Sequence, residues 1–399
     1  MRTPLSRHRA SPALRFLRAT LLAPDRAEAA KPFAARLGAG GIVRELAAED
    51  DLRRALPAVG AMLKDAGLLE RLPADERSAL SAARMSATMR AEAVRVTLEP
   101  LGAVCAQTGV VPLLLKGTAL HGRKGWPAVL RPVSDVDLLV KPADFQALRV
   151  ALTFAELAPE PLTAGRLAAY DGSGDKEFFL SDFVFRRTDG EGVPVEAKLD
   201  PVQVGRALAR AAAFFEGATE SKAYPGFQVP APEPMAVQQA IHLARHDGSD
   251  VLWFAELAGG VRAAGSRFDV AKADALVADE GLLGTVRAAF AAAEELFPGS
   301  FPKAALRGGG KTGWTPARLR GRVGKAGKPD ERAATWTLSL AHALSSRRPL
   351  ATLGTLRRRI WPRSEYVAAR MGLPEGKKAN IVHRVKRLLL LAGRRGGGE

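Results

Sequence analysis

Residues 111–140 constrain the fold of this chain more than any other stretch, because an apolar strand there leads to a second strand that carries two acids. The stretch begins with the run VPLLLK, passes a turn at Lys116 and Gly117, and ends with the run DVDLLV. Side chains alternate between the two faces of a strand, so Asp135 and Asp137 share one face and their apolar neighbours share the other. The pattern predicts a strand that packs on a core with one face and presents two carboxylates on the other.

Two carboxylates on one face of a strand predict a metal site. Acids beside a hydrophobic core are costly to bury without a partner, and a divalent cation removes that cost. Mg²⁺ bound by carboxylates together with substrate phosphates is a common arrangement. The alternative is an exposed edge strand with solvated acids, since the pattern D-x-D also occurs by chance.

The turn before the acids predicts a phosphate site. Gly117 ends the first strand, and a helical run follows from Thr118 to about Arg123. Glycine lets backbone N–H groups approach a phosphate closely, and a helix N-terminus favours an anion. Lys116 adds a positive charge at the same turn, as a phosphate-binding lysine would. We therefore expect Lys116, Gly117 and Thr118 to contact a phosphate group.

The string LKGTAL…RPVSDVDLLV resembles the bacterial uncharacterised nucleotidyltransferase family, a branch of the superfamily that includes DNA polymerase β. The resemblance implies an α+β fold, in which a polymerase β-like catalytic domain with a mixed sheet is flanked by N- and C-terminal helical domains. It also implies transfer of a nucleoside monophosphate from an NTP to a hydroxyl-bearing acceptor, with release of pyrophosphate. The implied cofactor is Mg²⁺, with two ions in the site and Mn²⁺ as an alternative.

The resemblance implies a role for a third acid, Glu196, on the predicted strand VPVEAKLD. The superfamily places its third metal-binding carboxylate at this point, so Asp135, Asp137 and Glu196 would together hold the metal. The family string is close to V-E-x-H-W, and here Lys198 and Leu199 stand where histidine and tryptophan are common. The alternative is a surface Glu–Lys pair on an edge strand, because Glu196 and Lys198 point to the same side.

Four further residues are candidates for the site. The resemblance implies that Ser134 assists at the phosphates and that Arg131 orients the acids or contacts a phosphate. His242 and His246 lie at i and i+4 on a helical run, hence on one face. That spacing can bind zinc, but no glutamate follows His242 and no third ligand is evident. A structural role, or lining the site from a second domain, is the preferred interpretation.

Turn signals and composition divide the chain into five parts. We expect an N-terminal helical region (1–88), a catalytic domain (89–230), a helical domain (231–302), a basic glycine-rich linker (303–330) and a basic C-terminal helical region (331–399).

Positive charge is concentrated near the C-terminus. The whole chain has a net charge of +17, and residues 303–399 hold 23 Lys and Arg against 5 Asp and Glu. This is a candidate footprint for RNA or another anionic partner. The alternative is an arginine-rich but simply solvated surface.

The sequence does not decide which acceptor receives the nucleotide, and it leaves three hypotheses from different classes of function. A small-molecule or peptide acceptor is favoured by the single glycine in the turn. An RNA or tRNA acceptor is the alternative, because the motif also resembles nucleotidyltransferase toxins of toxin–antitoxin systems, whose turn usually reads L-K-G-G. A third hypothesis is a catalytically inactive nucleotide-binding module.

The sequence also predicts a cytoplasmic location. The chain has a single cysteine, Cys105, so it cannot form an internal disulfide framework. Arg15 and Arg18 interrupt the apolar run near the N-terminus, which argues against a signal peptide. No apolar run is long enough to span a bilayer.

Overall fold

The computed structural model describes residues 11–307, apart from residues 39–40, 124–125, 127, 172–182, 202–207 and 279–280. From residue 308 onward it describes only residue 319 and scattered positions between 361 and 386. The predicted basic linker and the predicted C-terminal helical region therefore lie largely outside the described residues.

A seven-stranded mixed sheet forms the centre of the part that the structure describes, in the order β3-β4-β5-β2-β1-β7-β6. The pairs β2–β5 and β1–β7 are parallel, and the other neighbours are antiparallel. The strands are short: β1 (Leu113–Leu114), β2 (Val136–Leu139), β3 (Leu157–Pro159), β4 (Phe183–Arg187), β5 (Val195–Lys198), β6 (Thr219–Glu220) and β7 (Gln228–Val229).

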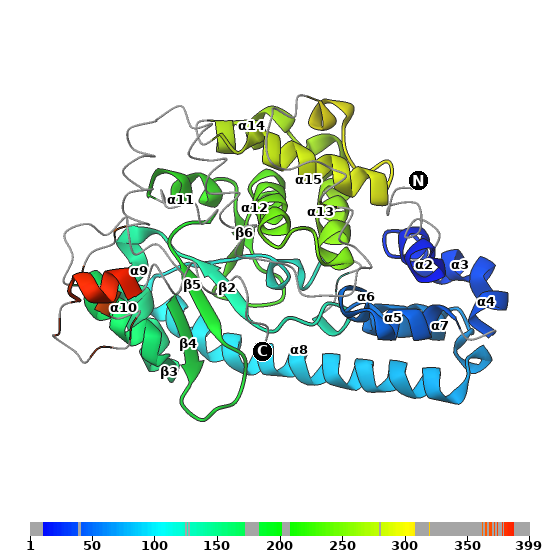
Figure 1. The fold of residues 1–399 in the computed structure, drawn as a ribbon, viewed down its shortest axis with the longest axis horizontal. Coiled ribbons are helices and arrows are strands. Elements are labelled where there is room, and N and C mark those ends of the chain that lie inside the picture. Colours follow the sequence, from blue (N-terminus) through cyan, green and yellow to red (C-terminus); the bar gives the residue numbers. More distant parts are fainter. Residues whose placement is uncertain are drawn as a thin grey trace.

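A long helix, α8 (Ala74–Thr108), runs along one side of the molecule and leads directly into β1 (Figure 1). It ends at Gly109, whose left-handed φ of 72° lets the chain turn into the sheet. The sequence predicts a helix from about Asp75 to Thr108, and the structure confirms it.

Shorter N-terminal helices pack near the far end of α8 (Figure 1). They are α2 (Pro12–Thr20), α3 (Arg26–Ala30), α4 (Ala34–Gly38), α5 (Ile42–Ala48), α6 (Asp50–Arg53) and α7 (Leu56–Asp65). The short 3-10 turns η1 (Lys31–Phe33) and η2 (Leu69–Arg71) connect this group.

A second helical group covers the sheet opposite α8 (Figure 1). It consists of α12 (Pro232–Arg245), α13 (Val251–Ala264), α14 (Val270–Ala278) and α15 (Leu283–Leu296), with η7 (Gly265–Arg267) and η8 (Lys303–Leu306). The remaining helices lie between strands of the sheet in the chain: η3 (Thr118–Leu120), η4 (Ala128–Leu130), η5 (Pro142–Asp144), α9 (Phe145–Phe154), α10 (Pro161–Asp171) and α11 (Leu208–Phe215). A mixed sheet with helical flanks confirms the predicted α+β fold, whereas the domain boundaries stay a prediction.

None of the helices within the described residues combines the length and the hydropathy needed to cross a membrane.

Close packing between α8 and the connection from β6 to β7 depends on Gly102. A Cβ added there would lie 2.3 Å from the carbonyl oxygen of Pro225, and one added at Gly226 would lie 2.3 Å from the carbonyl oxygen of Gly102. Two stretches of backbone therefore touch at this point, and a methyl group fits between them only if they separate.

Gly102→Ala is therefore expected to destabilise the protein by about 1–3 kcal/mol through overpacking. In a helix with free space the same change stabilises by about 0.5–1 kcal/mol. Gly260→Ala in α13 is the matched control, because its Cβ would meet nothing nearer than the Gln239 side chain at 4.0 Å. Urea unfolding measures both, and equal effects of the two changes would contradict the packing described.

Candidate active site

Parallel pairing of β2 with β5 brings three acids together. Asp137 lies opposite Glu196 in register, and Asp135 immediately precedes β2. The neighbouring Val136 and Val195 are fully buried, which confirms that the apolar face of each strand packs on the core. One oxygen from each of the three carboxylates lies within 4.8 Å of the others. Three carboxylates at this spacing suit a hard divalent cation.

Two lysines contact the buried member of this acidic triad (Asp135, Asp137 and Glu196). The Nζ atoms of Lys116 and Lys198 lie 2.8 and 2.9 Å from Asp137 Oδ1. Lys198 also donates a hydrogen bond of 2.6 Å to Glu196 Oε2. Burial tends to raise the pKa of Asp137, but the two ammonium groups outweigh it and hold that pKa below its ordinary value. Asp137 is thus a carboxylate at neutral pH.

The turn between β1 and η3 has an unusual backbone. Lys116 adopts a left-handed φ of 52°, which residues other than glycine rarely adopt and which often marks a functional site. Gly117 has an ordinary helical φ of −57°. A side chain is excluded there for another reason, since a Cβ would lie 2.7 Å from Val133 and 3.0 Å from the guanidinium of Arg131.

The helix expected from Thr118 to about Arg123 is shorter in the structure, where only the 3-10 turn η3 forms. The turn η3 ends at His121, whose imidazole ring is held by a hydrogen bond at each of its two nitrogens. Its Nε2–H donates to the carbonyl of Arg131 at 2.9 Å, and the hydroxyl of Tyr224 donates to Nδ1 at 2.8 Å. Burial lowers the pKa of His121 to about 4, so the ring stays neutral in this arrangement.

Arg131 is held inside the protein. It is 2% exposed, forms an ion pair with Glu256 on α13, and donates to the carbonyl of Pro132 at 2.8 Å. Burial tends to lower the pKa of Arg131, but Glu256 raises it overall, so the guanidinium stays charged. These contacts join the loop before β2 to the second helical group. The role in orienting the acids or binding phosphate stays a prediction.

Ser134 is exposed beside the triad. Its hydroxyl donates a hydrogen bond of 3.1 Å to Asp135 Oδ1. Asp135 is half-buried and makes no ion pair within the described residues. Asp135 is therefore the acid of the triad whose carboxylate is not paired with a lysine and is accessible to a ligand.

A cavity of about 350 Å³ opens beside the triad and is walled on the far side by α12 and α13. His242, His246 and Trp253 line it and contact one another, with ring centroids 4.4–4.9 Å apart. Arg54 lies over the Trp253 ring at 5.8 Å and pairs with Asp250 at 2.7 Å. Burial, followed by the charge of Lys116, lowers the pKa of His242 well below its ordinary value, so this imidazole is neutral.

A scan against protein-family models matches residues 46–298, more than half of the chain, to a family described as uncharacterised nucleotidyltransferase. The chain belongs to this nucleotidyltransferase family. The resemblance stated from the sequence is therefore confirmed, and membership supports a transferase role with a nucleotide substrate. The matched span contains all the residues named above as lining the cavity. Searches of curated proteins and of solved structures returned no match.

Within the described part of this nucleotidyltransferase, the acidic triad is the only cluster of three or more potential metal ligands. His242 and His246 have no third ligand there, so the zinc alternative has no support. The two histidines instead line the cavity, as the preferred interpretation expected.

The sequence pointed to neither Arg54 nor Arg245 of the cavity wall, and Trp253, which the sequence favours as a core residue, lines the cavity as well. Arg245 follows His242 by three positions on α12, so the helical spacing could have placed it on the same side. Its Nε atom is buried and has no hydrogen-bond partner within the described residues. Arg54 comes from the N-terminal helices and carries no local signal of function.

Proposed function

We propose that the chain transfers a nucleoside monophosphate from an NTP to a hydroxyl group of a small molecule or peptide, with release of pyrophosphate. Mg²⁺ is the proposed cofactor, and Mn²⁺ is the alternative. The observation that carries the proposal is the meeting of three carboxylates within 4.8 Å beside a cavity that also contains Lys116 and Arg245.

Asp135, Asp137 and Glu196 would hold the metal. When bound, Mg²⁺ neutralises phosphate charge and activates the attacking oxygen, and the resemblance implies two ions for these roles. Their carboxylate oxygens are the ligand type that Mg²⁺ prefers. Ser134 would support this arrangement by its hydrogen bond to Asp135.

The cationic groups of the cavity would hold the triphosphate. Lys116 lies at the turn with Gly117 and Thr118, and Arg245 lines the opposite wall. The acceptor oxygen forms a bond to the α-phosphorus while the bond to the bridging oxygen breaks, and pyrophosphate leaves with the electron pair. The acceptor hydroxyl loses its proton to water in this step.

Arg245→Gln is expected to weaken NTP binding about tenfold or more, since a charge-assisted hydrogen bond contributes about 1.5–3 kcal/mol. Binding of the corresponding NMP should change little, because the lost contact is to the β- or γ-phosphate. Arg90→Gln on the exposed face of α8 is the control. Calorimetric titration with NTP and NMP measures both affinities. An equal loss for the two nucleotides would contradict the proposed role.

The function is tested by incubating the protein and Mg²⁺ with NTPs labelled at the α-phosphate and with extract fractions as acceptors. Label in the small-molecule or peptide fraction is the expected result. Label in the RNA fraction would support the RNA acceptor instead. No transfer into any fraction would favour the inactive nucleotide-binding module.

A further inference from the structure

Lys198 lies within the acidic triad rather than beside it. Its Nζ atom contacts Asp137 Oδ1 at 2.9 Å and Glu196 Oε2 at 2.6 Å. These oxygens belong to two of the three acids expected to hold metal. A cation that joined the same two oxygens through Mg–O bonds of about 2.1 Å would occupy the space of this ammonium group.

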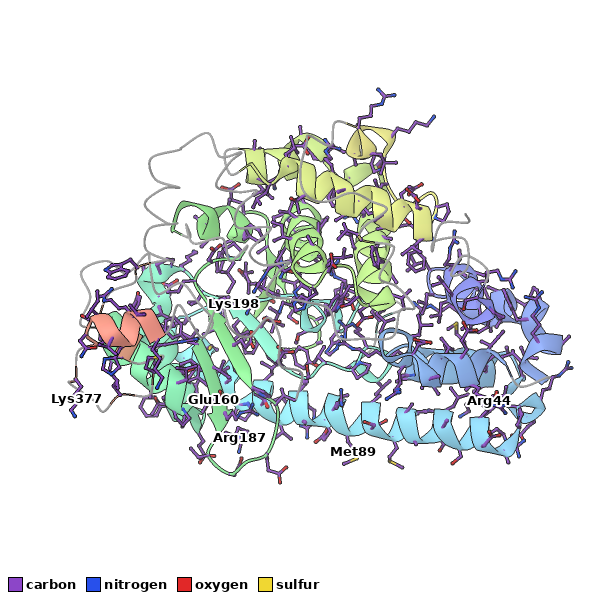
Figure 2. The ribbon with its side chains drawn as sticks, in the orientation of Figure 1. Arg44, Met89, Glu160, Arg187, Lys198 and Lys377 are labelled. Atoms are coloured by element: carbon purple, nitrogen blue, oxygen red, sulfur yellow. The ribbon has the colours of Figure 1, made fainter. Side chains whose placement is uncertain are left out.

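The Lys198 side chain is also enclosed. It is 3% exposed, compared with 20% for Lys116. Strand alternation places it on the same side of β5 as Glu196, and it lines the cavity. Figure 2 labels it at the end of β5. A divalent ion placed against this buried ammonium would meet strong repulsion, because screening is weak away from solvent.

The charge balance of the site also argues against a second divalent ion. Lys116 and Lys198 both contact Asp137, and Lys198 also contacts Glu196, so two of the three acidic charges are matched by lysines. Asp135 makes no ion pair within the described residues and is more exposed than Asp137. Asp135 therefore remains the unmatched acid of the triad, and it offers a place for one divalent ion beside Asp137 on the cavity side.

Resting on the proposed function, we propose that Lys198 takes the place of one of the two divalent cations implied by the resemblance. The site then binds a single divalent ion with the nucleotide, and the fixed ammonium of Lys198 supplies the second positive charge. A neutral imidazole at this position would leave room for a second ion.

The test counts Mn²⁺ ions by electron paramagnetic resonance in the full chain saturated with an α,β-methylene NTP analogue, using each base in turn. The wild type is expected to bind one Mn²⁺ per nucleotide complex and to give the spectrum of an isolated ion. Lys198→His at pH 8 is expected to bind two, with the broadening of two coupled spins. Lys198→Arg keeps the cation and should bind one.

Lys116→Met is the matched control and should still bind one ion, since Lys116 contacts the same Asp137 oxygen from a more exposed position. Two coupled ions in the wild type would overturn the proposal, whether or not any variant folds. One ion in both the wild type and a folded Lys198→His variant would overturn it as well. Thermal melting establishes which variants are folded.

Failure of this proposal can be told apart from failure of the proposed function. Two ions in the wild type, together with label transfer that Asp135→Asn abolishes, would remove only the role of Lys198. Metal binding and label transfer that are both insensitive to Asp135→Asn would remove the proposed function itself.

Discussion

Asp135→Asn is expected to lower the rate of Mg²⁺-dependent nucleotide transfer about 1,000-fold or more. A metal held at the triad supplies several kcal/mol of charge stabilisation in the transition state, and each 1.36 kcal/mol is tenfold in rate. Stability should stay within about 0.5 kcal/mol of the wild type, because Asp135 is half-buried and makes no ion pair within the described residues. Label transfer and urea unfolding measure the two quantities.

Asp137→Asn separates the catalytic and structural roles of the site. It should abolish transfer as Asp135→Asn does, but it should also destabilise the protein by about 1–3 kcal/mol. The reason is that the buried ammonium of Lys198 would keep Glu196 but lose its other carboxylate. Asp65→Asn, at an exposed acid on α7, is the control and should change neither quantity. Full activity in the double variant Asp135→Asn/Asp137→Asn would leave only a nucleotide-binding module.

Arg131→Met is expected to cost about 3–5 kcal/mol of stability, because it leaves the Glu256 carboxylate buried without its partner. The double variant Arg131→Met/Glu256→Leu should recover most of that loss, since a well-packed apolar pair can replace a buried ion pair. The free energy of unfolding in urea measures both. A stable Arg131→Met variant with weakened NTP affinity would contradict the structural role and support phosphate binding instead.

The acidic face of β2 could be predicted from the sequence because strand periodicity is local. Asp135 and Asp137 alternate with Val136 and Leu138, and that pattern alone separates the two faces. The same alternation predicts that Glu196 and Lys198 share a side, which the structure confirms. That Glu196 joins the two aspartates came from the family resemblance. The parallel pairing of β5 with β2, with Glu196 opposite Asp137, was not predicted.

Contacts between distant parts of the chain were beyond sequence patterns. Arg131 and Glu256 are separated by 125 positions, and nothing local marks them as partners. Arg54 reaches the cavity from the N-terminal helices, and Arg245 reaches it from α12. The shortened η3 has a similar cause, because the chain leaves the helical path where His121 bonds to Arg131 and Tyr224. Tertiary contacts of this kind override the local helical tendency.

Parallel reactions with one NTP labelled at the α-phosphate and the same NTP labelled at the γ-phosphate test nucleotidyl transfer most directly. With Mg²⁺ and a competent acceptor fraction, the α-label is expected to appear on the acceptor and the γ-label in pyrophosphate. Both products should disappear in Asp135→Asn. Appearance of the γ-label on the acceptor would show phosphoryl transfer and would contradict the proposed reaction.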